Sequence, residues 1–271
     1  MSEHIAFIGG GNMASAIISG LLRRGFAPSQ IDVVEPFLEA RQKLESSFGV
    51  NAQAAAGEFL NRTSMVVWAV KPQSFQEAAL QTQAFTANAL HLSVAAGIQS
   101  SSMARWLGSE RIVRAMPNTP ALIGKGISGL FARAAVSDVD RRLAEQIVAS
   151  TGEWLWLSDE AQLDAVTALS GSGPAYVFYF LEAMVNAGVE MGLPREQAYH
   201  LAASTFIGAG ELARASSELP EILRQRVTSK GGTTHAAITV LDQNNVNKLF
   251  ESALLAAGRR ARELGEEFGA D

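Results

Sequence analysis

A short apolar run that stops at three glycines, close to the beginning of the sequence, restricts the fold more than any other stretch. Residues 5–8 are apolar and predict a buried strand. The apolar residues beyond the glycines recur every three or four positions and predict an amphipathic helix: Met13, Ile17, Ile18, Leu21 and Leu22. A glycine-rich turn in this setting is typical of a dinucleotide-binding fold, with an ordinary strand–helix turn as the alternative.

In the spacing Gly9-x-Gly11-x-x-Ala14, each small residue meets a different structural requirement. The first glycine permits a tight turn, the second lets the backbone approach a pyrophosphate, and the third position must be small so that helix and strand can pack. The helix N-terminus offers unpaired N–H groups and a partial positive charge to phosphates. We therefore expect Gly9, Gly11, Asn12 and Met13 to bind the cofactor.

The bulk composition excludes several classes of protein. With 271 residues, of which 48% are hydrophobic and 18% charged, the chain can form one large domain or two ordinary ones around a substantial core. The net charge of −5 argues against nucleic acid or anionic membranes as partners. The sequence has no cysteine, no apolar run of roughly 20 residues that could span a membrane, and no signal-peptide pattern. We expect a cytoplasmic protein.

Strands and helices alternate in the first part of the sequence. Further strands are predicted at 31–34, 65–70, 90–94, 112–113, 127–131 and 154–157. A helix is predicted at 38–48, and Ser137 and Asp140 have the spacing of a capping box that opens another. This alternation predicts an α/β fold: a Rossmann-type, mostly parallel sheet covered by helices on both faces.

After about residue 160 the pattern becomes helical. Helices are predicted at 161–169, 174–191, 194–216, 220–228, 234–242 and 246–268. We expect a dinucleotide-binding domain at 1–160 and an all-helical substrate and dimerisation domain at 161–271. A helical region this apolar is expected to bury surface against a second subunit; docking on its own sheet is the alternative.

Glu35 ends the second predicted strand, 21 residues after Ala14. In dinucleotide-binding folds an acidic side chain there accepts hydrogen bonds from the adenosine ribose hydroxyls and repels a 2′-phosphate. Glu35 would then tolerate NADH and disfavour NADPH. The alternative is a side chain that points to solvent, and Arg41 is the nearest cation that could offset the carboxylate.

Other strand ends carry small, turn-forming or hydrogen-bonding residues, which we also expect at the cofactor: Ala69, Val70, Lys71, Pro72, Ala95, Gly97, Met116 and Asn118. Lys71 could lie near phosphate or be a solvated surface lysine. The stiff segment 114–120, with two prolines around Asn118 and Thr119, suits a nicotinamide ring, although a structural turn would look the same.

Five segments now point to one family. They are Gly-Gly-Gly-Asn-Met-Ala at 9–14, Ala-Val-Lys-Pro-Gln at 69–73, the segment 114–120, Ser-Gly-Ser-Gly-Pro-Ala-Tyr at 170–176 and Gly-Gly-Thr-Thr at 231–234. In this order the sequence resembles pyrroline-5-carboxylate reductases over residues 4–242. The resemblance implies reduction of 1-pyrroline-5-carboxylate to proline with NADPH or NADH. It also implies a homodimer that assembles further, with a decamer as one candidate.

The segment 228–234 precedes a predicted helix and forms an amide-rich concavity suited to an anion, here the substrate carboxylate. By resemblance, Thr234 hydrogen-bonds the ring nitrogen and passes it a proton, whereas Ser229 and Thr233 contact the carboxylate. Gly231, Gly232 and Ser172 complete the expected substrate site. A cyclic imine is readily protonated, so its reduction needs positioning and a polar donor more than a strong acid or a metal. As an alternative, Thr233 or Thr234 is merely a helix N-cap.

Two other classes of protein share part of this pattern, and one residue departs from the pattern of the reductases. A β-hydroxyacid dehydrogenase would carry a catalytic lysine where this sequence has Val177, and a non-catalytic dinucleotide sensor would need no substrate loop. Pyrroline-5-carboxylate reductases usually carry proline where this sequence has Lys230. Because lysine does not fix φ as proline does, the backbone of this loop has more freedom. His, Asp and Glu do not cluster at metal-ligand spacing, so no metal site is expected.

Overall fold

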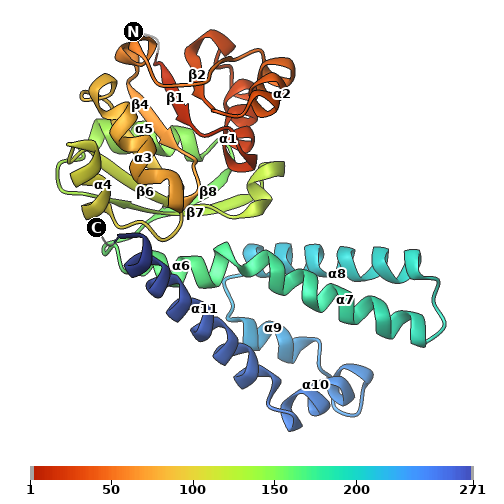
Figure 1. Cartoon of the computed structure of the whole chain (residues 1–271). Helices are drawn as coiled ribbons and strands as arrows, with labels where there is room; N and C mark the ends of the chain where they lie inside the picture. Colours follow the sequence, from red (N-terminus) through yellow and green to blue (C-terminus); the bar gives the residue numbers. More distant parts are fainter. Residues whose placement is uncertain (1–2, 270–271) are drawn as a thin grey trace. The chain divides into compact units, whose positions relative to one another are not determined.

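The computed structural model describes residues 3–269 (Figure 1). Contacts divide the chain into two compact units. The first, called the sheet unit, comprises Met1–Ser172 together with Ala257–Asp271; the second, called the helical unit, is Gly173–Ala256. The division into functional domains near residue 160 stays a prediction.

The sheet unit is built on an eight-stranded sheet with the order β3-β2-β1-β4-β5-β6-β7-β8. The strands are β1 Ile5–Ile8, β2 Ile31–Val34, β3 Asn51–Gln53, β4 Met65–Trp68, β5 Leu90–Ser93, β6 Ile112–Met116, β7 Gly126–Ala132 and β8 Gly152–Trp156. β1 pairs in parallel with β2 and β4, so that Ile5 lies between Ile31 and Met65. Only the β6–β7 pair is antiparallel within the described sheet. The predicted Rossmann-type, mostly parallel sheet is confirmed.

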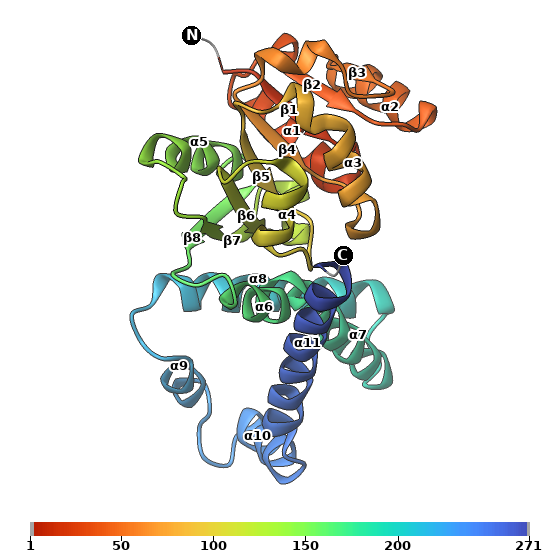
Figure 2. The same cartoon turned by 60° about the vertical axis from the view of Figure 1, so that its left-hand side comes forward.

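Alternate residues of each central strand enter two separate cores. Ile5 and Phe7 of β1 face one core, whereas Ala6 and Ile8 face the other. The first core is completed by α1 Asn12–Arg23, α2 Leu38–Phe48 and α5 Asp138–Val148, and the second by α3 Phe75–Thr82 and α4 Ser100–Leu107 (Figure 2). The sheet is therefore covered on both faces, as the unbroken apolar strands predict.

Two local features refine the sequence prediction. The capping box of α5 is confirmed, because the Ser137 hydroxyl accepts the Asp140 N–H and the Asp140 carboxylate accepts the Ser137 N–H. Strand β3 was not predicted. Asn51 and Gln53 are polar and exposed, and only Ala52 is buried, so this short edge strand carries no apolar run.

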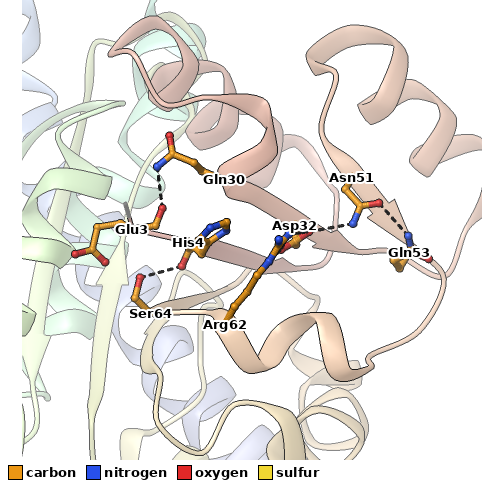
Figure 3. A network of polar contacts seen from close by, with 8 residues as sticks. All are labelled: Glu3, His4, Gln30, Asp32, Asn51, Gln53, Arg62 and Ser64. Atoms are coloured by element: carbon orange, nitrogen blue, oxygen red, sulfur yellow. Dashed lines mark hydrogen bonds and ion pairs between the residues drawn. The ribbon is translucent and has the colours of Figure 1, made fainter. Parts of the chain in front are cut away.

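A polar network lies where β1, β2 and β3 begin (Figure 3), whereas the glycine turn follows the end of β1. Asp32 of β2 is fully buried and accepts two-pronged hydrogen bonds from Arg62, whose Nη2 lies 2.8 Å from Oδ2. Asn51 donates a further hydrogen bond to Asp32. Arg62 ends the short 3₁₀ helix Glu58–Arg62, so the ion pair fastens that segment to the sheet.

Every element that follows β8 in the described chain is helical. These are α6 Gln162–Val166, a π-helical turn Thr167–Gly171, α7 Gly173–Glu190, α8 Arg195–Ala215, α9 Pro220–Arg226, α10 Thr233–Gln243 and α11 Val246–Gly269. The predicted succession of helices is confirmed. None of the helices of residues 3–269 combines the length and the apolar character that crossing a membrane requires.

The helical unit has a small core and a large apolar surface. Val185 of α7 packs against Ala198 and Ala202 of α8, and Gly188 lets the two helices approach closely. Many large apolar side chains remain exposed, among them Phe178, Tyr179, Met191, Ile207, Leu212, Leu249 and Leu255. An apolar surface of this extent is typical of a subunit interface.

Candidate functional site

The residues predicted to bind the cofactor in the sheet unit gather at one edge of the sheet. They follow the carboxyl ends of adjacent parallel strands: Gly9, Gly11, Asn12 and Met13 after β1, Glu35 after β2, Ala69, Val70, Lys71 and Pro72 after β4, Ala95 and Gly97 after β5, and Met116 and Asn118 at and beyond the end of β6. The strand order turns at β1, which has β2 on one side and β4 on the other. In open α/β sheets this switch point is where ligands bind.

Three small residues of the glycine turn are required for three different reasons. Gly9 has a φ of 93°, and a Cβ there would lie 2.7 Å from the carbonyl oxygen of Ala69. Ala69 is fixed in that place because its N–H donates to the carbonyl of Ile8. Ala14 is fully buried. Gly11, in contrast, faces open space within 4 Å, so its lack of a side chain serves no contact within the protein.

The N-terminus of α1 lies directly behind this open space. Gly11 is the N-cap residue, and no side chain caps the helix. The N–H groups of the first turn and the helix dipole are therefore available to an anion. An open glycine backbone followed by an uncapped helix N-terminus fits a pyrophosphate, as the sequence predicts for Gly11, Asn12 and Met13.

Glu35 is held firmly beside the turn. Its side chain is buried, Oε2 accepts the N–H of Gly10 at 2.8 Å, and Oε1 accepts the N–H of Phe37 at 3.0 Å. The alternative in which Glu35 points to solvent is therefore wrong. A Cβ on Gly10 would lie 2.5 Å from Cδ1 of Leu44 and 3.2 Å from Oε2 of Glu35, so the middle glycine is needed for this arrangement.

Two basic residues are close in sequence to the strand ends at this edge. Within residues 3–269, Arg41 is hydrogen-bonded to the protein, whereas Lys71 is not. Nη1 of Arg41 donates to the backbone carbonyls of Glu35 and Pro36, at 2.9 and 2.8 Å, and so stabilises the loop after β2. Lys71 is exposed and precedes the 3₁₀ turn Pro72–Ser74. Its ammonium makes no hydrogen bond or ion pair with the described residues. Both interpretations of Lys71 stay open.

Gly97 is small for a reason that the sequence did not reveal. Its φ is 74°, and a Cβ would lie 3.3 Å from Leu264 and Phe268 of α11. The end of α11 is further tied down because Ser102 donates to the carbonyl of Gly269. Gly97 therefore accommodates a helix more than 160 residues away along the chain, whatever it does for the cofactor. Ala95 is buried nearby.

Met116, the last residue of β6, lies against Gly171. A Cβ on Gly171 would lie 2.6 Å from Cε of Met116, so these predicted site segments are in contact. The Asn118 side chain accepts the N–H of Ile127 and thereby braces the loop against β7. Asn118 thus has a structural role, and its expected role at the cofactor stays a prediction.

Arg114, the first residue of the predicted loop, instead lies within β6 and belongs to a cluster that the sequence did not indicate. Its Nη1 lies 2.7 Å from Glu160, which also accepts the N–H and hydroxyl of Ser100. Burial alone would raise the pKa of Glu160, but the hydrogen bonds from Ser100 and Arg114 outweigh it and hold the pKa below its usual value. Asp164 and Arg262 line a cavity of about 370 Å³ beside this cluster.

Ser172 follows the π-helical turn Thr167–Gly171, and its N–H closes that turn on the carbonyl of Thr167 at 2.8 Å. Turns of this type are frequent at functional sites. The Ser172 hydroxyl makes no hydrogen bond with another of the described residues, so it is available to a ligand.

The remaining predicted substrate residues form a tight turn in the helical unit. The N–H of Gly232 donates to the carbonyl of Ser229, and Gly231 has a φ of 77°. Gly232 is the N-cap of α10 and no side chain caps the helix, so Thr233 and Thr234 occupy its first two positions. The alternative in which a threonine is the N-cap is wrong. The first-turn N–H groups of α10 are uncapped, as an anion site requires.

The sequence is similar to known proteins over its full length. The chain is 45% identical over 270 residues to the pyrroline-5-carboxylate reductase of Pseudomonas aeruginosa, covering 99% of both chains. The chain belongs to the pyrroline-5-carboxylate reductase family. The enzyme of that name from Pisum sativum is 37% identical, covering 97% of this chain and 96% of its own.

Solved structures and family descriptions support the same family. The pyrroline-5-carboxylate reductase of Coxiella burnetii aligns with a TM-score of 0.90 at 38% identity, covering 97% of this chain and 99% of its own. The Plasmodium falciparum pyrroline carboxylate reductase, solved with NADP bound, aligns with a TM-score of 0.88 at 27% identity, covering 97% and 98%. Residues 160–264 match the pyrroline-5-carboxylate reductase dimerisation family, and residues 4–97 match the family of coenzyme F420-dependent NADP oxidoreductases.

Proposed function

We propose that this member of the reductase family reduces the C=N bond of 1-pyrroline-5-carboxylate to give L-proline, the last step of proline biosynthesis, with NADPH or NADH as hydride donor. The full-length similarity to reductases of that name carries this proposal. The β-hydroxyacid dehydrogenase alternative lacks support in the chain itself, because Val177 occupies the position where such an enzyme needs lysine.

The glycine turn supports the proposed binding of the coenzyme. Gly11 leaves open space above the uncapped N-terminus of α1, where Asn12 and Met13 offer backbone N–H groups to a pyrophosphate. Small residues after β4 and β5 would let a ribose and a nicotinamide lie close to the backbone. When bound, the nicotinamide supplies the hydride; the protein contributes orientation and exclusion of water.

The substrate side draws on the turn before α10. The N–H groups at Gly231, Gly232 and the start of α10 would bind the carboxylate, assisted by the hydroxyls of Ser229 and Thr233. Thr234 would donate a hydrogen bond to the imine nitrogen. As hydride adds to the carbon of the C=N bond, the nitrogen would take this proton to become the amine, and the hydroxyl would regain a proton from solvent. Ser172, whose hydroxyl makes no hydrogen bond with another of the described residues, is proposed by itself as a further substrate-binding residue.

We also propose the assembly and the compartment. The exposed apolar side chains of the helical unit and the match to a dimerisation family support a homodimer, which we propose assembles further into a decamer.

We propose a domain boundary near residue 160, because the two family matches lie on either side of it. The first domain would bind the dinucleotide, and the second would bind substrate and dimerise. We propose a cytoplasmic enzyme, because a sequence without cysteine fits a reducing compartment.

An absorbance assay tests the function directly. Oxidation of NADH and NADPH is followed with 1-pyrroline-5-carboxylate, and a β-hydroxyacid with the oxidised coenzymes serves as the control. We expect turnover with the imine and none with the hydroxyacid. Turnover with the hydroxyacid alone would replace this function with the dehydrogenase, and silence with both substrates would favour a non-catalytic dinucleotide sensor.

A further inference from the structure

We infer that Glu35 makes this enzyme prefer NADH over NADPH, because it fixes a carboxylate where the 2′-phosphate of NADPH would lie. The inference rests on the proposed coenzyme site and adds which coenzyme that site selects.

The position of Glu35 places it at the adenosine ribose. It follows β2, the strand adjacent to β1, and its Oε2 accepts the N–H of Gly10 in the glycine turn itself. The side chain that ends the second strand of a dinucleotide-binding fold lies beside the ribose hydroxyls. The hydrogen bond to Gly10 thus joins the ribose end of the site to its pyrophosphate end.

The carboxylate cannot turn away from an incoming phosphate without losing both anchors. Oε1 is held by the N–H of Phe37 and Oε2 by that of Gly10, and the side chain is buried. Each carboxylate oxygen has a second lone pair that remains free to accept a ribose hydroxyl. A 2′-phosphate offers no donor to those lone pairs and adds like charge at short range in a poorly solvated place.

The nearest cation does not reverse this balance. NADPH is accommodated where an arginine faces the 2′-phosphate. In this chain Nη1 of Arg41 donates to the carbonyls of Glu35 and Pro36, so the guanidinium is attached to the loop that carries the carboxylate. A phosphate that reached Arg41 would therefore meet a guanidinium already engaged by two backbone carbonyls.

Calorimetric titration of NAD⁺ and NADP⁺, which differ only in the 2′-phosphate, tests the inference without turnover. We expect the unmodified enzyme to bind NAD⁺ at least about tenfold more tightly. Glu35→Gln keeps the size of the side chain and one acceptor oxygen but removes the charge, and should reduce that ratio at least about fivefold. Glu39→Gln removes the same charge from an exposed position of the first turn of α2 and should leave the ratio unchanged.

Equal or tighter binding of NADP⁺ by the unmodified enzyme would overturn the inference, even if Glu35→Gln fails to fold. A ratio that Glu35→Gln does not change, or that Glu39→Gln changes equally, would also overturn it, because the discrimination would then come from elsewhere. Binding of neither nucleotide would remove the coenzyme site and the inference with it. Turnover with NADPH alone would leave the proposed reaction intact and overturn only the role of Glu35.

Discussion

The indole N–H of Trp68 donates a hydrogen bond to Nδ1 of His91, 3.1 Å away, between the neighbouring strands β4 and β5. Nδ1 must therefore be unprotonated, which places the proton of the neutral ring on Nε2. Nε2 is buried and has no hydrogen-bond partner among the described residues. Burial, and then the positive charge of Arg111, lower the pKa of His91 from 6.5 to about 4.

This pair predicts a loss of stability in mild acid. The unfolded chain takes up the His91 proton near pH 6.5 and the folded chain only near pH 4, so stability from this group is fully present above pH 6.5 and falls as the pH drops towards 4. The loss amounts to about 3 kcal/mol. Urea unfolding at pH 7 and pH 4.5 measures it.

His91→Gln retains an acceptor for Trp68 and should flatten this pH dependence, whatever its effect at pH 7. The control is His200→Gln, because His200 is exposed on α8. An equally steep acid loss in His91→Gln would refute the assignment to His91.

The buried carboxylate of Asp32 predicts that the protein loses stability when its partner Arg62 is replaced. Arg62→Gln would leave this fully buried charge with Asn51 as its remaining donor. We expect the free energy of unfolding to fall by about 2 to 4 kcal/mol, less than for a wholly buried pair because Arg62 is 49% exposed. The exposed pair Arg226–Glu218 supplies the control, and Arg226→Gln should cost less than about 1 kcal/mol.

A double variant separates charge burial from loss of packing. Asp32→Asn combined with Arg62→Gln removes the uncompensated charge and should recover part of the stability lost in Arg62→Gln. If the double variant is less stable than Arg62→Gln by the full cost of Asp32→Asn alone, the two residues act independently and the ion-pair explanation fails.

The glycine turn predicts opposite results for two alanine substitutions. Gly9→Ala combines a positive φ with a Cβ 2.7 Å from a carbonyl oxygen, and should cost about 2 kcal/mol or more of stability. Gly11→Ala meets no protein atom within 4 Å and should keep the stability while weakening NAD⁺ binding. Gly25→Ala, with a φ of 94° and open space around it, shows how much of the Gly9 cost is backbone strain alone. Thermal unfolding and calorimetric titration supply both readouts.

Local pattern explains which parts of this structure could be predicted from sequence. The strand, turn and helix at 5–23 were predictable, because apolar spacing and glycines encode them within a few residues. The ion pair of Arg114 with Glu160 spans 46 positions, and Gly97 meets Phe268 across a far longer separation. No local pattern joins such partners. The sequence therefore predicts candidate site residues, whose roles stay predictions, but it does not reveal the contacts that hold these residues in place.

Lys230 offers a prediction about the substrate loop. It is exposed next to Gly231 in the turn before α10, where an ammonium would attract the substrate carboxylate. Lys230→Met and Lys230→Pro should both raise the KM for 1-pyrroline-5-carboxylate, by roughly threefold at low salt. Equal KM values for the parent and both variants would remove this role. A rise in Lys230→Met alone would show that the rigidity of proline compensates for the lost charge, because methionine removes the ammonium without restricting the backbone.

Thr234 carries the chemical prediction. It occupies the second position of α10, and its hydroxyl makes no hydrogen bond within residues 3–269, so it is free to donate to a ring nitrogen. Thr234→Ala should lower kcat roughly a hundredfold, because the imine loses its positioned donor, while NADH affinity measured by fluorescence stays unchanged. Thr234→Ser restores a hydroxyl and should recover most of the rate. Thr239→Ala, which removes a hydroxyl bonded to the carbonyl of His235 in the same helix, should leave kcat close to that of the parent. An unchanged kcat in Thr234→Ala would eliminate Thr234 as the donor, whereas equal losses in Thr234→Ala and Thr239→Ala would assign the effect to the stability of α10.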